Sequence, residues 1–125
     1  MNRFLTVLLP VQDVQATLAQ TVEEVLDTAA ALTDRFELLI IDDGSADATS
    51  EVAHELTRHY PQVRAIRHSR PLGQEAALRT GLAQSQGEVV LVRDGGCLTM
   101  ARLPHGNRPA RPNYLARLEQ MALGQ

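Results

Sequence analysis

Hydrophobic residues fall into two patterns along this chain: short continuous runs and longer stretches with helical spacing. The continuous runs cover residues 4–9, 36–41 and 88–92, and a weaker run covers residues 63–66. Runs of this length are typical of strands that are buried on both faces of a parallel sheet. The pattern therefore predicts four strands.

The stretches between these runs carry apolar residues at the period of an α-helix. In the first stretch, these residues are Val14, Leu18, Val22, Val25, Leu26, Ala29 and Leu32. Asp13 precedes them and belongs to a residue type that is favoured at helix N-caps. A second helix is indicated after Ser45 and ends near Pro61, and a third ends near Gly87. Strands and helices alternate, so right-handed crossovers predict an α/β fold with a parallel sheet covered on both faces.

Polar residues follow the predicted strands. The four strand ends lie at residues 10–12, 42–44, 69–71 and 94–96, and three of them contain an acid or an arginine. In open parallel sheets, ligands bind beyond the carboxyl ends of the strands, where the strand order reverses. We therefore expect a functional site at this edge. A polar rim without a ligand is the alternative interpretation.

Composition narrows the classes of function. All 12 basic residues are arginine, and there is one cysteine. The absence of lysine excludes Schiff-base and P-loop chemistry, and 3% aromatic residues offer few stacking platforms for nucleic acid. The apolar run at the N-terminus is too short to span a bilayer. A single cysteine suits a reducing compartment. We expect a cytoplasmic protein with no membrane span and no nucleic-acid partner.

The last part of the chain differs from the rest. Residues 97–125 carry four arginines and one acid, and prolines and glycines precede an amphipathic stretch at residues 114–122. We expect one α/β domain over residues 1–96, followed by a loop and a short C-terminal helix over residues 97–125.

Four segments resemble the family 2 glycosyltransferases, inverting enzymes of the GT-A fold that use nucleotide sugars. The segments are V-L-L-P-V at residues 7–11, F-E-L-L-I-I-D-D-G-S-A-D-A-T at 36–49, S-R-P-L-G-Q-E-A-A-L-R-T-G-L at 69–82 and Q-G-E-V-V-L-V-R-D at 86–94. They follow the family's order and spacing. The resemblance implies a Rossmann-like, three-layer α/β/α nucleotide-binding half, with a mostly parallel four-stranded sheet in the order 3-2-1-4.

The resemblance also implies a donor site. In this family the second aspartate of the D-D-G-S turn hydrogen-bonds the nucleotide base, which places that role on Asp43. Arg70 matches a position near the donor, where a guanidinium binds phosphate with two hydrogen bonds. An exposed arginine without a ligand is the alternative for Arg70. Pro10, Val11 and Asp94 complete the implied set of nucleotide-binding residues.

The family's D-x-D motif holds a divalent cation that bridges the donor diphosphate. In this chain the motif reads Asp94-Gly95-Gly96 and keeps one of its two carboxylates. Losing even a residue that supports a metal ligand lowers metal affinity by about 10–100-fold, so we expect a weak Mg²⁺ or Mn²⁺ site at Asp94. Glu119 is the one acid that follows, and we assign no catalytic residue.

Two functions remain open from the sequence. One is a nucleotide-sugar-binding relative of these glycosyltransferases, with UDP- or GDP-sugars as the expected donors and with glycosyl transfer undecided. The other is a non-catalytic interaction or regulatory subunit that keeps only the fold. In a 3-2-1-4 sheet the fourth strand lies at an edge and invites pairing. We therefore expect a homodimer formed through that strand and the C-terminal helix.

Overall fold

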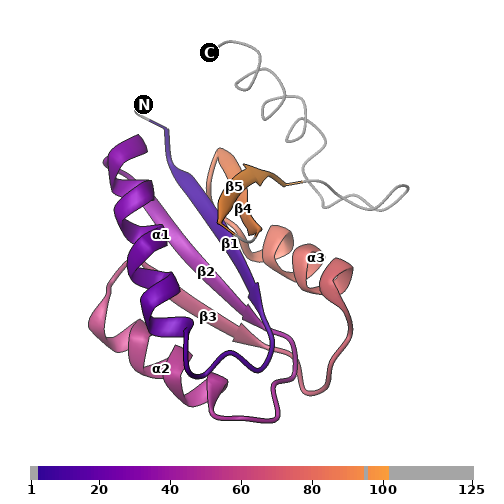
Figure 1. Ribbon diagram of the computed structural model, residues 1–125. Helices are drawn as coiled ribbons and strands as arrows, with labels where there is room; N and C mark the ends of the chain where they lie inside the picture. The colour runs from indigo at the N-terminus through magenta and orange to yellow at the C-terminus, as the bar shows by residue number, and fades with distance from the viewer. Residues whose placement is uncertain (1–2, 95, 102–125) are drawn as a thin grey trace.

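The computed structural model describes residues 3–94 and 96–101 (Figure 1). The elements are β1 (Leu5–Val11), α1 (Leu18–Leu32), β2 (Phe36–Asp42), α2 (Thr49–His59), β3 (Val63–Arg67), α3 (Gln74–Gln84), β4 (Val89–Asp94) and β5 (Cys97–Met100). The four strands and three helices that the hydrophobic pattern predicts are confirmed. None of the helices in this part of the chain has the length and apolar character needed to cross a bilayer.

The five strands form one sheet in the order β3-β2-β1-β4-β5. β1 pairs in parallel with both β2 and β4, and β2 pairs in parallel with β3. The predicted order of the first four strands and the mostly parallel sheet are confirmed. β5 is an addition, and it runs antiparallel to β4, with Cys97 opposite Asp94.

The expectation that β4 forms an edge of the sheet is wrong. β5 pairs with it from Leu91 to Asp94, and the amide of Ala101 donates to the carbonyl oxygen of Val90 at 3.1 Å. The dimer expected through β4 therefore loses its premise, and the expected C-terminal helix lies outside the described residues. Two consecutive glycines between apolar runs are a hairpin signal that our interpretation of this segment as a loop overlooked.

Helices cover both faces of the sheet. α1 and α2 lie on one face and α3 lies on the other (Figure 1). The chain moves from β1 through β2 to β3 in one direction and then returns past β1 to β4. Because the crossovers are right-handed, this reversal places α3 on the opposite face. The three-layer α/β/α architecture is confirmed.

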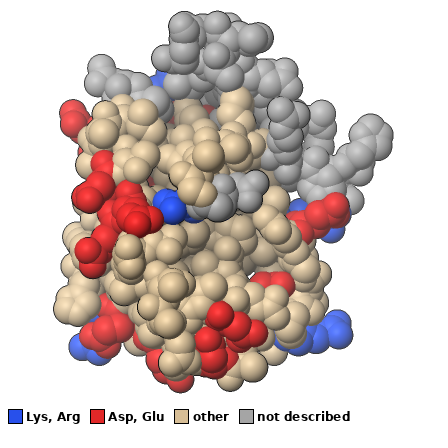
Figure 2. All heavy atoms as spheres, viewed as in Figure 1, with Lys and Arg blue, Asp and Glu red and all other residues tan. Residues whose placement is uncertain are grey.

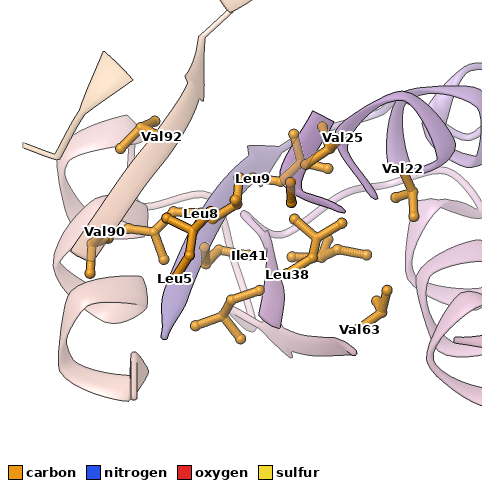
Figure 3. Packing of buried hydrophobic residues seen from close by; sticks show 14 of the residues in the cluster. Leu5, Leu8, Leu9, Val22, Val25, Leu38, Ile41, Val63, Val90 and Val92 are labelled. Atoms are coloured by element: carbon orange, nitrogen blue, oxygen red, sulfur yellow. The ribbon is translucent and has the colours of Figure 1, made fainter. Parts of the chain in front are cut away.

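The core lies on both sides of the central strands (Figure 3). Leu5, Leu8, Leu38 and Ile41 are fully buried, as expected for strands with helices on both faces. α1 packs its buried residues at spacings of three or four, and they are Leu18, Val22, Val25 and Ala29. β3 has one fully buried side chain, Val63, which explains the weaker hydrophobic run there.

A buried polar cluster joins the amino ends of β1, β2 and β3. Glu37 accepts hydrogen bonds from Oγ1 of Thr6 at 2.7 Å, the amide of Gln86 at 2.8 Å and Nε of Arg64 at 3.0 Å. Oγ1 of Thr6 in turn accepts from the amide of Gly87 at 2.9 Å. The cluster anchors the connection between α3 and β4 at the end of the sheet opposite to the strand ends with the predicted site.

Candidate functional site

A cavity of about 170 Å³ lies at the carboxyl ends of β1 and β2. Its lining residues are Pro10, Val11, Gln12, Asp43, Gly73, Gln74 and Ala77. β1 stands at the point where the strand order reverses, which is where ligands bind in open parallel sheets. Three predicted nucleotide-binding residues, Pro10, Val11 and Asp43, line this one cavity. Gln12, Gly73 and Gln74 were not predicted, and they come from the same β1 end and from the start of α3.

Asp43 directly follows β2, and its side chain is 8% exposed. Its Oδ1 accepts hydrogen bonds from Nδ1 of His68 at 2.8 Å and from the amide of Leu72 at 2.9 Å. Its Oδ2 accepts one from the amide of Gly73, also at 2.9 Å. Burial raises the pKa of Asp43, but these hydrogen bonds outweigh burial and hold the pKa below its ordinary value of 3.8. The carboxylate is therefore ionised at neutral pH and only accepts hydrogen bonds.

His68 is the site residue that sequence reasoning missed. Its side chain is 9% exposed, and its Nε2 lies 2.8 Å from Oγ1 of Thr80 in α3. Because ionised Asp43 has no proton to donate, Nδ1 of His68 carries the hydrogen of their bond. His68 thereby joins the end of β2 to α3. The signal was its position: it directly follows β3, at the edge where Asp43 follows β2.

The turn after β2 is connected to the loop after β1. Oδ1 of Asp42 accepts from the amide of Ser45 at 3.1 Å and from its hydroxyl at 2.6 Å. Oγ of Ser45 accepts from the amide of Asp13 at 2.8 Å, and Oδ1 of Asp13 accepts from the amide of Ala46 at 2.7 Å. Asp42 therefore orients the turn. These bonds hold the two loops together beside the cavity.

The N-cap expected for the first helix is wrong, and the helix indicated after Ser45 begins farther along the chain than that residue suggests. Asp13 does not cap α1, which begins at Leu18; its φ of 53° turns the chain so that its side chain faces the other loop. Ser45 does not cap α2, which begins at Thr49. Oδ1 of Asp47 accepts from the amide of Thr49 at 2.8 Å instead. Both residues serve contacts between loops that are more than 30 residues apart, which local capping rules do not describe.

Arg70 approaches the turn through its backbone. A Cβ atom at Gly44 would lie 2.3 Å from the carbonyl carbon of Arg70 and 2.4 Å from the nitrogen of Pro71. Gly44 has a φ of +67°, which glycine adopts without strain. The side chain of Arg70 is exposed and is not among the residues that line the cavity. Its phosphate contact stays a prediction.

Asp94 is the last residue of β4, and its side chain lies outside the described part of the structure. Leu8 pairs with Val92, so Pro10 and Asp94 stand two residues farther along neighbouring parallel strands. This register places the backbone of Asp94 near the cavity. Within residues 3–94 and 96–101, no cluster of three or more His, Cys, Asp or Glu side chains is arranged to hold a metal ion. The cation at Asp94 stays a prediction.

Solved structures of two enzymes resemble this fold. The mannosyltransferase PcManGT from Pyrobaculum calidifontis, in complex with GDP-Man and Mn²⁺, has a TM-score of 0.65 at 19% identity, covering 75% of this chain and 28% of that chain. Glucosyl-3-phosphoglycerate synthase from Mycobacterium tuberculosis, in complex with Mn²⁺, UDP and phosphoglyceric acid, has a TM-score of 0.58 at 27% identity, covering 74% of this chain and 32% of that chain.

Sequence relatives agree with the fold. The glycosyltransferase AglE of Haloferax volcanii is 29% identical over 97 residues, which are 75% of this chain and 31% of AglE. The chain thus spans less than a third of the length of AglE and of both structural neighbours. The family model for glycosyl transferase family 2 matches residues 6–98, well over half of the chain. The motifs, the fold and this match lead to one conclusion: the chain belongs to glycosyltransferase family 2.

Proposed function

We propose that this protein binds a nucleotide sugar, with the base in the cavity at the ends of β1 and β2. The observation that carries this proposal is the ionised carboxylate of Asp43 in the lining of that cavity. An ionised carboxylate accepts a hydrogen bond from a ring N–H, which uracil, thymine and guanine offer. Pro10, Val11 and Ala77 supply apolar wall for the base, a combination typical of small-molecule sites.

The diphosphate needs positive charge at this end of the molecule. Acidic side chains gather near the ends of β1–β3 on the face shown in Figure 2. Asp13 and Asp47 lie in the loops at this end, and Asp42 and Asp43 stand at the end of β2. Their charge repels a diphosphate. We propose that Arg70 and a weakly held Mg²⁺ or Mn²⁺ ion at Asp94 compensate this charge, the cation being shared with phosphate oxygens. PcManGT and the synthase were both solved in complex with Mn²⁺ and a nucleotide or nucleotide sugar.

Glycosyl transfer is the activity that family membership suggests. The chain spans less than a third of the length of AglE. We therefore propose glycosyl transfer only as the activity of the family, and we assign it to no particular residue. We assign no catalytic residue within the described part of the chain. UDP in one structural neighbour and GDP-Man in the other leave the base of the donor open between uracil and guanine.

One observation favours the alternative, an interaction module that keeps only the fold. Three internal donors already hold the carboxylate of Asp43, so the residue has a structural role even without a ligand. In that case the cavity would have no affinity for nucleotides. Direct binding measurements separate the two functions.

Isothermal titration calorimetry of the full chain with UDP, UDP-glucose and GDP-mannose, with and without Mn²⁺, tests the proposal. We expect binding that Mn²⁺ strengthens and that Asp43→Ala removes. Asp27→Ala, at an exposed position of α1, is the matched control and should bind as the wild type does. If Asp43→Ala still binds nucleotides, the base binds at a site other than Asp43. If the wild type binds none of the nucleotides, the interaction module is favoured.

A further inference from the structure

We infer that His68 determines which base this site accepts: by occupying an acceptor position on Asp43, it selects a base with a single N–H donor, uracil or thymine, over guanine. This inference rests on the proposed nucleotide site. It concerns the identity of the donor, which family membership leaves open.

Hydrogen bonds within the protein fill most of the acceptor positions on Asp43. An ionised carboxylate has two oxygens with about four lone-pair positions in all. His68 and Leu72 fill both positions on Oδ1, and Gly73 fills one of the two on Oδ2. One acceptor position remains, on Oδ2, which also accepts the hydrogen bond from the amide of Gly73. Asp43 and Gly73 both line the cavity, and we infer that a ligand in the cavity reaches this remaining position.

The bases differ in the number of hydrogen-bond donors that they can offer to Asp43. Uracil and thymine present one ring donor, N3–H, between two carbonyl oxygens. Guanine presents two neighbouring donors, N1–H and the N2 amino group, which pair best with two carboxylate oxygens side by side. With Oδ1 full, one guanine donor loses its partner. A buried donor left without a partner lowers affinity by about tenfold or more.

His68 is held in place by hydrogen bonds to its ring and to its backbone. Its Nδ1 lies 2.8 Å from Oδ1 of Asp43, and its Nε2 lies 2.8 Å from Oγ1 of Thr80. Its amide also donates to the carbonyl oxygen of Asp42 at 2.9 Å. A side chain that is 9% exposed and held at both ring nitrogens, on a backbone that is itself hydrogen-bonded, does not turn aside easily for a ligand. The remaining donors on Asp43 are backbone amides, so His68 is the one side chain whose replacement frees Oδ1.

The test compares UDP with GDP, which share the diphosphate and differ in the base. Calorimetry on the full chain should give UDP an affinity about tenfold above that of GDP in the wild type. His68→Ala removes the donor and opens the space in front of Oδ1, and the ratio should fall toward one. Thr80→Val removes the other partner of the imidazole but leaves Nδ1 facing Asp43. This matched control should keep most of the wild-type ratio.

A measurement on the wild type makes the test independent of how well the variants fold. ¹⁵N NMR should show hydrogen on Nδ1 of His68 with and without UDP. A bare Nδ1, or GDP binding as tightly as UDP to the wild type, would overturn the inference while leaving the nucleotide site in place. If neither nucleotide binds, both the inference and the proposed function fail.

Discussion

Nδ1 of His68 and Oδ1 of Asp43 lie 2.8 Å apart, across 25 residues of sequence. The register of the sheet explains this contact, because Asp42 pairs with Arg67 and the two site residues follow these partners directly. A shift of one residue between β2 and β3 would separate them and turn the side chains of β3 to the opposite face. Parallel pairing thus brings His68 against Asp43, which lines the cavity.

Acid should weaken the folded state through Asp43. Burial raises the pKa of Asp43, but hydrogen bonds from His68, Leu72 and Gly73 hold it below 3.8 in the folded state. The unfolded chain therefore takes up the proton first. The stabilisation is fully present above 3.8 and is lost as the pH falls through the lower folded value. We expect Asp43→Asn to flatten the acid side of the unfolding free energy against pH, measured by urea denaturation.

The matched control for this prediction is Asp27→Asn, at an exposed position of α1. Its curve should follow that of the wild type. Wild-type acid dependence in Asp43→Asn would contradict the role given to these hydrogen bonds.

Glu37→Ala should destabilise the protein by about 3 kcal/mol, because it leaves Thr6 and Arg64 without their shared acceptor in a mostly buried position. Arg64 is 39% exposed, so water compensates part of the loss and the cost stays at the lower end of the range for buried pairs. Glu88→Ala is the control, since it removes a 3.8 Å ion pair with Arg3 at the surface, where we expect a change below about 1 kcal/mol. If urea denaturation shows the same loss of unfolding free energy for Glu37→Ala and Glu88→Ala, the buried cluster contributes no more to stability than the surface ion pair.

Gly44→Ala should be one of the most damaging small substitutions. The added Cβ would meet the backbone of Arg70 and Pro71 at 2.3 and 2.4 Å, and the φ of +67° disfavours alanine. We expect a loss of about 3 kcal/mol from strain and displacement of the neighbouring loop. Gly96→Ala adds the same methyl group where nothing lies within 4 Å, and should change stability by less than about 0.5 kcal/mol. Thermal unfolding of the two variants measures the difference.

Gly96→Asp should strengthen cation-dependent nucleotide binding. The position has open space for a side chain, and it adds a second carboxylate two residues after Asp94. We expect the affinity for UDP in the presence of Mn²⁺ to rise by about tenfold or more, because restoring a ligand reverses a loss of that order. Gly96→Asn, which adds the same shape without charge, is the control. A rise in affinity without Mn²⁺ would point to an effect on the loop rather than on a metal site.

Local pattern was enough to predict the scaffold. A strand with helices on both faces must be apolar at nearly every position. The apolar run at residues 36–41 was therefore enough to predict β2 without reference to any other segment. The same logic placed Pro10, Val11 and Asp43 at one edge, because the strand ends of a parallel sheet meet there. β5 was missed because its four residues alternate between exposed and half-buried side chains, so they form no continuous apolar run of the kind that predicted the other strands.

Tertiary structure alone decided the chemistry of that edge. His68 has no neighbour in sequence that marks it, and its role depends on the pairing of β2 with β3 and on the place of Thr80 in α3. Asp13 is an N-cap by residue type, yet a loop 33 residues away takes its carboxylate. Hydrophobic burial acts through periodicity along the chain, whereas hydrogen bonds between loops depend on distances that exist only after the sheet has formed. The sequence by itself therefore determined the first four strands and the edge of the sheet at which the cavity lies, and the packed structure determined the contacts of the side chains at that edge.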